Sequence, residues 1–248
     1  MKQNDHFVSI ILPVYNARKY LSAAVQSMLS QTYPNIEVIA IDDNSKDDSY
    51  ALLRTFRKKD KRIRIYRNKK RYGLAVCLNR AVKRAKGQFI AFMDPTHISA
   101  KSRIKKQVSY LLQHPKVVAV GLQCTIIDHK NKKLGKSDFP ADHSDIYKTL
   151  PLGSSMLFET TLVNKQLLPK DLLKFTTNAY PFVYVHVFMQ ILQYGLLANL
   201  VDYLHSYRKT TIRTYAQLGG IERFFHTIRL VTQSLVQYDY KPSLRSFF

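Results

Sequence analysis

The sequence predicts an α/β fold in which a mostly parallel central sheet is flanked by helices. Apolar runs of strand length alternate with stretches of helical spacing from the N-terminus to Asp94, and this alternation is typical of a doubly wound parallel sheet. The first run, residues 8–12, is continuously apolar and rich in β-branched residues, which indicates a strand buried on both faces. No linker-like tract, repeat or low-complexity segment interrupts the chain, so we expect one domain with a C-terminal extension.

The elements of the first half follow from this pattern. The expected strands are residues 8–12, 36–41, 63–66 and 89–93, and the expected helices are residues 16–30, 46–59 and 74–85. We expect the first strand to stop at Pro13, because proline has no backbone N–H. We also expect Asp47 and Asp48 in the first turn of the second helix, where the helix dipole favours acids.

The second half is less regular. We expect a helix at residues 103–113, strands at 117–122 and 124–128, a loop at 129–135, and further segments at 150–158, 184–192 (helical) and 198–207. A last helix is expected at residues 221–236, with an apolar stripe formed by Ile221, Phe224, Phe225, Ile228, Val231 and Leu235. Such a stripe is compatible with a helix at a membrane interface and equally with a terminal helix that caps the core.

The charge balance predicts an anionic partner. The 248 residues include 39 Lys and Arg against 17 Asp and Glu, a net charge of +22. Such a field attracts nucleotide phosphates, nucleic acids or an acidic membrane surface. The basic residues cluster at 54–70, 83–86, 101–106 and 130–136, and each cluster alone is explained by a solvated helix face or loop. The chain has no helix-turn-helix, zinc-finger or RNP-like pattern, so we expect no specific nucleic-acid partner.

The cysteines and the N-terminus bear on the compartment. Cys77 and Cys124 stand in apolar contexts without CxxC spacing, which predicts buried free thiols and a reducing environment. We find no signal-peptide pattern, and no apolar run reaches the ~18–20 residues that a membrane span needs. We therefore expect a cytoplasmic protein, or one that is peripheral on the inner face of the membrane.

Polar residues follow three of the expected strands: Tyr15 and Asn16, then residues 42–45, then Asp94. In open α/β sheets the ligand binds beyond the carboxyl ends of the strands. Turn formation alone would explain any single cluster, especially Asp-Asn-Ser. Three clusters on neighbouring strands favour a binding site.

Four stretches resemble glycosyltransferase family 2. They are VSIILPVYNARKYL (8–21), SQTYPNIEVIAIDDNSKDDS (30–49), YGLAVCLNRAVKRAKGQFIAFMD (72–94) and GLLANLVDYLHSYRKT (195–210). They occur in the family's order, and the resemblance reaches to about residue 210. It implies a Rossmann-like GT-A fold over residues 1–210, with a nucleotide-binding half (1–98) and an acceptor half (99–210). Residues 211–248 would then form a basic, amphipathic C-terminal helical extension.

The resemblance implies a nucleotide-diphosphate sugar as donor, with UDP-sugars favoured. Pro13 and Tyr15 would line the nucleoside pocket, and Asp43 would contact the base, since a carboxylate accepts from the imide N–H of uracil. Arg71 and Gly73 precede a helix N-terminus, where phosphate binds readily. Without the resemblance, a surface turn at 13–16, a helix cap at 42–45 and a plain loop at 69–74 would explain these residues.

The metal motif of the family is altered in this chain. Its strand ends in an Asp-x-Asp motif that holds Mg²⁺ or Mn²⁺ against the diphosphate, and the same acid also contacts the donor. Here Asp94 is kept, Thr96 replaces the second acid, and His97 follows. The expected ligands are therefore Asp94 and Thr96, with His97 either a Mn²⁺ ligand or a polar surface residue.

The base motif is altered as well. Inverting members use an acid, often in a Glu-Asp pair at the start of a helix, to deprotonate the acceptor hydroxyl. That pair falls on Val183 and Tyr184. His186 is a candidate base or a packed helix residue. With Asp94 and His186 as catalytic residues, the chain would transfer sugar to a glycan or a lipid-linked acceptor. The alternative is a catalytically impaired protein that binds nucleotide or glycan, or scaffolds an active partner.

Overall fold

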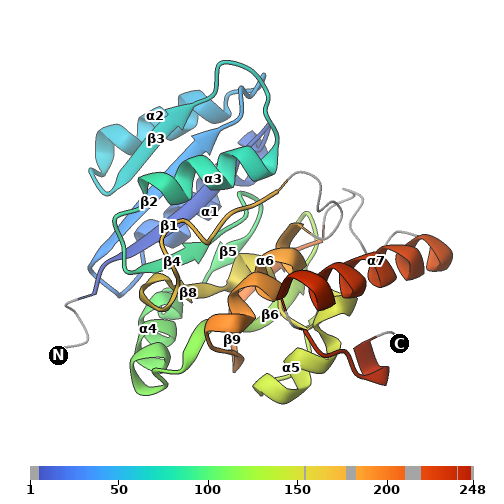
Figure 1. The fold of residues 1–248 in the computed structure, drawn as a ribbon. Helices are drawn as coiled ribbons and strands as arrows, with labels where there is room; N and C mark the ends of the chain where they lie inside the picture. Colours follow the sequence, from blue (N-terminus) through green and yellow to red (C-terminus); the bar gives the residue numbers. More distant parts are fainter. Residues whose placement is uncertain (1–5, 154, 177–182, 210–218, 239, 247–248) are drawn as a thin grey trace.

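The computed structural model describes residues 6–153, 155–176, 183–209, 219–238 and 240–246. Within them, helices flank a nine-stranded sheet of order β3-β2-β1-β4-β8-β6-β9-β5, and β7 pairs with β6 (Figure 1). Strands β1, β2, β3 and β4 are parallel, and β6 is parallel to β9. Strands β5, β7 and β8 run in the opposite direction. The predicted α/β class with a mostly parallel sheet is confirmed.

The first half contains every predicted element. The strands are β1 (Val8–Val14), β2 (Ile36–Asp42), β3 (Ile63–Arg67) and β4 (Phe89–Phe92), and the helices are α1 (Arg18–Leu29), α2 (Ser49–Lys59) and α3 (Leu74–Arg84). The prediction that Pro13 ends β1 is wrong. Val14 O accepts from Asp43 N on the β2 side, so the missing N–H of Pro13 faces the other side, where pairing with β4 ends at Phe92. Proline is tolerated there because no partner needs its hydrogen.

The predicted start of α2 is also wrong. The helix begins at Ser49 rather than Lys46, and Asp47 and Asp48 precede its first turn. One oxygen of Asp47 accepts from Arg18 N at 3.0 Å, and the other accepts from Ser49 N at 3.0 Å. The carboxylate therefore ties the approach to α2 to the start of α1 instead of lying inside a helix.

The second half completes the sheet. Its elements are β5 (Ile98–Ser99), α4 (Arg103–Gln113), β6 (Val117–Ile127), β7 (Lys133–Lys136), α5 (His143–Thr149), the short helix η3 (Phe158–Thr160), β8 (Leu162–Asn164), α6 (Val183–Ile191), β9 (Leu196–Arg208) and α7 (Gly220–Tyr238). The two strands predicted at 117–128 form the single strand β6, whose pairing with β9 shifts around Leu122–Cys124. The predicted loop at 129–135 includes the start of β7.

Helices cover the sheet on both faces (Figure 1). Helices α1, α2 and α4 pack on one face through Leu21, Leu53 and Ile104, whereas α3, α5, α6 and α7 contribute to the core on the other. Neighbouring residues of β1 alternate between the two cores, as strand geometry requires: Ile10 belongs to the first and Ile11 to the second. Both cysteines are buried free thiols, as predicted.

Helix α7 lies in the predicted extension, of which residues 211–218, 239 and 247–248 are outside the described residues. Its buried residues are Thr227, Leu230, Val231 and Ser234. The predicted apolar stripe is therefore only partly buried, since Ile221, Phe224, Phe225 and Leu235 are exposed. In the described part of the chain, no helix is long and apolar enough to cross a membrane.

Candidate functional site

A cavity of about 730 Å³ lies beyond the carboxyl ends of β1, β2 and β4. That volume is typical of a pocket for a small ligand. All predicted donor-binding residues line it: Pro13, Tyr15, Asp43, Arg71, Gly73 and Asp94. The sheet topology explains this convergence, because parallel neighbouring strands end at the same edge.

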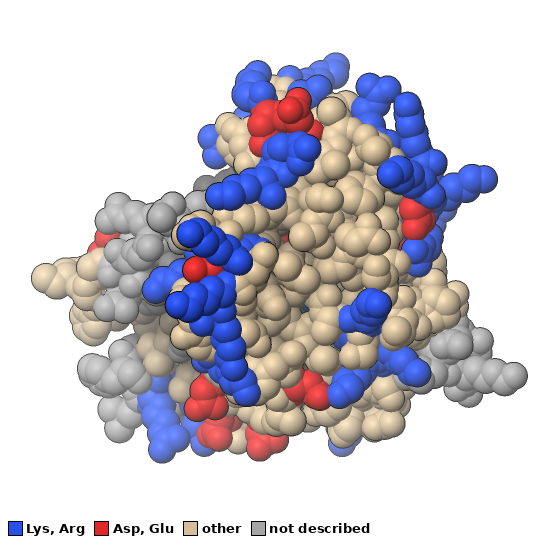
Figure 2. Space-filling view, turned by 180° about the vertical axis from the view of Figure 1, so that it is seen from behind, with Lys and Arg blue, Asp and Glu red and all other residues tan. Residues whose placement is uncertain are grey.

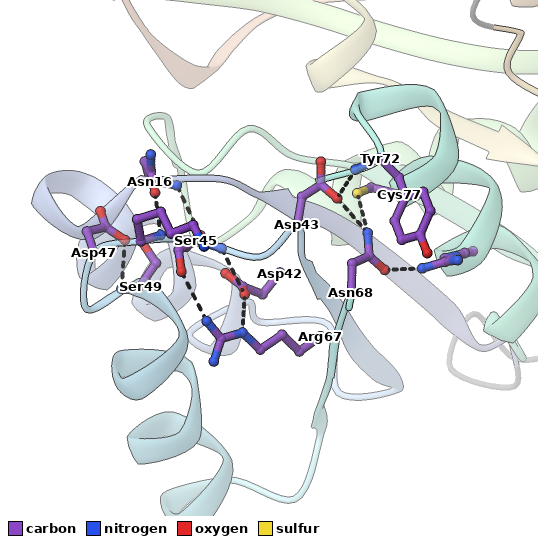
Figure 3. A network of polar contacts seen from close by, with 12 residues as sticks. Asn16, Asp42, Asp43, Ser45, Asp47, Ser49, Arg67, Asn68, Tyr72 and Cys77 are labelled. Carbon is purple, nitrogen blue, oxygen red and sulfur yellow. Dashed lines mark hydrogen bonds and ion pairs between the residues drawn. The ribbon is translucent and has the colours of Figure 1, made fainter. Parts of the chain in front are cut away.

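Asp43 is held in place by three hydrogen bonds, of which Figure 3 shows those from Asn68 and Tyr72. Its Oδ1 accepts from Asn68 Nδ2 at 2.6 Å and from Tyr72 N at 2.9 Å, and its Oδ2 accepts from Gly73 N at 2.7 Å. Burial alone would raise the pKa of Asp43, but these donors hold the pKa below its ordinary value. Asp43 is therefore ionised at neutral pH, and its orientation is fixed before any ligand binds.

The adjacent carboxylate of Asp42 points away from Asp43 (Figure 3). Its Oδ2 lies 3.2 Å from Arg67 Nε and accepts from Ser45 N at 3.2 Å. Asn16 joins the same network: its N–H donates to Ser45 Oγ at 3.0 Å, and its Oδ1 accepts from Lys46 N at 2.8 Å. Asn16 has a φ of 47°, a left-handed conformation that asparagine tolerates better than most residues. This network fixes the loops after β1 and β2.

Tyr15 and Arg71 face each other at the cavity. The Arg71 guanidinium lies 4.1 Å from the centre of the Tyr15 ring, which is 38% exposed. A cation at this distance is attracted to the face of an aromatic ring. The cavity is also lined by Lys19, His129 and Lys209, none of which our sequence interpretation singled out. They come from α1 and from the segments after β6 and β9, so no short motif unites them.

Asp94 is oriented by Thr96. The Asp94 Oδ1 atom accepts from Thr96 N at 2.7 Å and from Thr96 Oγ1 at 2.5 Å, so the hydroxyl supports the carboxylate. Thr96 O in turn accepts from Arg208 Nε at 2.9 Å. Among the described residues, no group of three or more His, Cys, Asp or Glu residues is arranged to hold a metal ion. Mg²⁺ in proteins is commonly held by one or two carboxylates plus substrate phosphates. Asp94 therefore fits a cation whose other ligands come from a bound diphosphate.

His97 is placed elsewhere than predicted. It is buried and absent from the cavity lining, and its Nδ1 lies 3.1 Å from His205 Nε2. Burial lowers the pKa of His97, so the ring is neutral at pH 7. This placement argues against His97 as a metal ligand.

His186 does not reach the cavity either. Its ring is buried between α6 and α7, and its Nε2 lies 2.9 Å from Tyr238 Oη. Burial lowers the pKa of His186. The contact with α7 argues for a packing role rather than for a catalytic base.

Glu159 is the acid that our sequence interpretation missed. It lies in η3 and lines the cavity together with Asp94 and Tyr184. As a lone acid in a largely apolar stretch it carries no sequence signal of its own. Contacts between distant segments bring it to the site, among them the packing of η3 against α6, where the rings of Phe158 and Tyr184 stack with their centres 4.3 Å apart.

Known proteins resemble this chain in sequence. The family model for "Glycosyl transferase family 2" matches residues 9–171. An uncharacterized glycosyltransferase of Haemophilus influenzae is 33% identical over 164 residues, which cover 66% of this chain and 64% of the relative. WfgD of Escherichia coli, described as a UDP-Glc:alpha-D-GlcNAc-diphosphoundecaprenol beta-1,3-glucosyltransferase, is 39% identical over 111 residues, which cover 45% of this chain and 43% of WfgD. The chain spans less than two thirds of the length of these relatives.

Solved structures share the fold. The structure of residues 1–349 of TarS from S. aureus, in complex with UDP-GlcNAc, has a TM-score of 0.76 at 19% identity, and the match covers 96% of this chain and 69% of that one. The mannosyltransferase PcManGT from Pyrobaculum calidifontis, in complex with GDP-Man and Mn²⁺, has a TM-score of 0.68 at 18% identity, with 98% and 68% covered.

Proposed function

Because the chain belongs to glycosyl transferase family 2, we propose that it transfers a sugar from a nucleotide-diphosphate sugar to an acceptor hydroxyl. UDP-sugars are the favoured donors. The observation that carries the proposal is the convergence of the six predicted donor-binding residues on one cavity. TarS has been crystallised with UDP-GlcNAc, and the name of WfgD states that it uses UDP-Glc.

The hydrogen bonds of Asp43 favour an imide as the ligand group. A carboxylate has about four acceptor positions, and the protein fills both positions on Oδ1 and one on Oδ2. The Cys77 thiol, a weak donor, also acts on the carboxylate, and an N–H group in the cavity would compete with it for the remaining position. Uracil and thymine each offer a single imide N–H, while Tyr15 offers a ring face for stacking. Asp43 would therefore select the base, and Tyr15 would hold it.

The diphosphate would lie among positive charges. Lys19, Arg71 and Lys209 line the cavity, and cations of this kind attract phosphate. Asp94 would hold Mg²⁺ or Mn²⁺ together with the diphosphate. A cation in that position neutralises charge on the leaving group.

The acceptor is proposed at the level of class only, as a glycan or a lipid-linked glycan. WfgD supports this class, because its name states a diphosphoundecaprenol-linked acceptor. The acceptor would enter where Glu159 and Tyr184 line the cavity. Inversion at the sugar carbon follows if the reaction is a single displacement.

Calorimetric titration with UDP, dTDP and GDP, each with and without Mn²⁺, tests donor binding. We expect UDP to bind, more tightly with Mn²⁺, and Asp43→Asn to weaken it by at least about tenfold, which corresponds to about 1.4 kcal/mol. Asp145→Asn, which changes an exposed acid on α5, is the matched control. Equal affinity of the Asp43→Asn variant and the wild type for UDP would contradict the base-binding role. Tight UDP binding without turnover of any UDP-sugar would favour the impaired, nucleotide-binding alternative.

An anionic membrane surface is a further proposed partner. Ile221, Phe225 and Val236 of α7 are 77%, 65% and 86% exposed. Lys and Arg side chains are spread over the face of the molecule shown in Figure 2 rather than gathered in one patch. Exposed apolar residues on a basic protein match a bilayer with acidic headgroups.

Co-sedimentation with vesicles tests this proposal. We expect the protein to sediment with phosphatidylglycerol-containing vesicles and not with pure phosphatidylcholine. The double variant Ile221→Ser and Phe225→Ser should reduce the bound fraction, whereas Leu134→Ser, at a 54% exposed position on β7, should not. Equal sedimentation of all variants would remove α7 from the interaction.

A further inference from the structure

Tyr184 occupies the place where the family resemblance puts the catalytic acid. An acid from another element, Glu159, lies in the same cavity. Its ring stacks on Phe158 with the ring centres 4.3 Å apart and the planes 7° from parallel. Residue 159 follows Phe158 directly and is a glutamate. Glu159 and Tyr184 both line the cavity that contains Asp94. An acid from η3 therefore lies in the same cavity as the residue that stands at the missing acid of α6.

The carboxylate of Glu159 has an unused acceptor. The residue is half-buried because part of it faces the cavity, but its Oε2 atom is buried and has no hydrogen-bond partner. Leaving a buried carboxylate oxygen unsatisfied is unfavourable. Unsatisfied buried groups in native proteins often have a functional reason. The missing partner leaves the carboxylate poorly solvated, which favours its taking up a proton, and the part of Glu159 that lines the cavity is what an acceptor hydroxyl would meet.

We propose that Glu159 is the general base for sugar transfer, in the position vacated at Val183 and Tyr184. This inference rests on the proposed function. The Glu159 carboxylate takes the proton from the acceptor O–H. The freed oxygen pair forms the bond to the anomeric carbon of the donor sugar. The bond from that carbon to the diphosphate oxygen breaks, and the nucleoside diphosphate leaves with the electron pair. The proton remains on Glu159 until it passes to solvent.

The electrostatics of the cavity suit this role. Burial and the negative charge of Asp94 raise the pKa of Glu159 to about 7, against the opposing effects of a backbone hydrogen bond and of the Arg103 charge. A base is most effective when its pKa lies near the working pH. The other titratable groups that interact with Glu159 are Cys124 on β6, Tyr184 on α6 and Tyr207 on β9, whose pKa values are all raised by burial. They are therefore neutral at pH 7 and leave the carboxylate as the proton acceptor.

Arg103 positions the two acids relative to each other. This fully buried side chain on α4 donates from Nη2 to Phe92 O at 3.0 Å and to Glu159 O at 3.1 Å. Phe92 is the last residue of β4, two residues before Asp94. One guanidinium thus joins the strand that carries Asp94 to the turn that carries Glu159. Arg103 is a positioning residue because it contacts only the backbone of both.

Donor hydrolysis, in which water is the acceptor, tests the proposal without knowledge of the natural acceptor. Release of UDP from UDP-Glc and UDP-GlcNAc is measured with Mn²⁺ for the wild type, Glu159→Gln, Glu159→Asp and the control Glu222→Gln, which changes an exposed acid on α7. UDP affinity with and without Mn²⁺ is measured on the same preparations. It reports folding and donor binding independently of the chemical step.

We expect Glu159→Gln to slow hydrolysis by about 10²–10⁴-fold, the usual contribution of a general base, with UDP affinity and its Mn²⁺ dependence unchanged. Glu159→Asp should keep part of the rate, and Glu222→Gln all of it. Hydrolysis by Glu159→Gln within threefold of the wild type would overturn the proposal. Loss of the Mn²⁺ dependence of UDP binding in Glu159→Gln would overturn it in favour of a metal ligand. A wild type that binds UDP but hydrolyses neither donor would instead overturn the proposed function, and the base assignment with it.

Discussion

Replacement of Arg103 by methionine removes a buried cation that joins two parts of the cavity wall, β4 and η3. The guanidinium donates to the backbone oxygens of Phe92 and Glu159, and also to Ser99 Oγ at 3.0 Å and Gln107 Oε1 at 3.1 Å. Methionine has a similar length and no donor, so it fills most of the space and leaves these acceptors unpaired. The perturbation is therefore chiefly one of hydrogen bonding rather than of volume.

The structure allows the size of the effect to be worked out. Each backbone carbonyl left buried without a donor costs about 1–3 kcal/mol, so Phe92 and Glu159 together give roughly 2–6 kcal/mol. The variant also removes a desolvated charge, which offsets part of this loss. The burial that causes this desolvation lowers the pKa of Arg103 to about 9. We expect Arg103→Met to lower the free energy of unfolding by about 3 kcal/mol.

Urea unfolding followed by circular dichroism measures this difference, and donor hydrolysis measures its effect on the site. Arg103→Lys is the matched control, because it keeps the charge but has no planar fork to reach both carbonyls. It should lose less stability than the methionine variant but a comparable part of the hydrolysis rate. A loss below 1 kcal/mol in Arg103→Met, together with wild-type hydrolysis, would refute the reasoning about Arg103.

Three further predictions follow from other parts of the structure. Hydrogen bonds from Lys86 N, Arg64 and Ser9 outweigh burial, which acts in the opposite direction, and hold the pKa of Glu37 below 4.5. The stability that Glu37 adds is therefore present at neutral pH and lost as the pH falls below 4.5, so the difference in unfolding free energy between wild type and Glu37→Gln should shrink on acidification in urea melts. Gly87→Ala would place a Cβ 2.6 Å from Ser9 N and should cost about 3 kcal/mol by the same assay; an unchanged midpoint would contradict it. Tyr15→Ala removes a stacking face and should weaken UDP binding by roughly tenfold or more in calorimetry, whereas Tyr203→Ala, far along β9, should not.

The sequence predicts the fold and the site best where they depend on residues that are close together along the chain. Strands β1, β2 and β4 are largely apolar, and Tyr15, Asp43 and Asp94 follow within two residues of their ends. Their convergence requires only that the strands be parallel and adjacent. Asp43 is bound by Tyr72 N and Gly73 N, 29 and 30 positions away, because the two loops lie at the same edge of the sheet. Periodicity predicts that polar residues meet at this edge, whereas the donor-binding roles of Asp43 and Arg71 came from the family resemblance.

The boundaries that failed did so because tertiary contacts overrode local preference. Proline predicts the end of a strand, but Pro13 stays in β1 because β4 stops beside it. Asp47 and Asp48 predict a helix start, but the Asp47 carboxylate accepts hydrogen bonds from the backbone N–H groups of Arg18 and Ser49. The hydrophobic stripe of α7 predicts its buried face, but the helix buries Thr227 and Ser234 and exposes Phe225. In each case the deciding partner lies on another element.

On the acceptor side of the cavity as well, contacts between segments that are distant in the sequence decide which acid lies in the site. The candidate base near the missing pair in the sequence is His186, but its ring contacts Tyr238 instead of the cavity. Glu159 lies 25 positions earlier than Tyr184 and reaches the site through the stack of Phe158 on Tyr184. Because residue 184 is a tyrosine, α6 lacks the acid expected there. The same tyrosine ring packs on Phe158, next to Glu159. If Glu159 is the base, a variant that restores an acid at 184 by Tyr184→Asp should not improve catalysis. It would bring a second negative charge beside Glu159 and break the stack that positions it, so hydrolysis should fall while UDP binding at Asp43 persists.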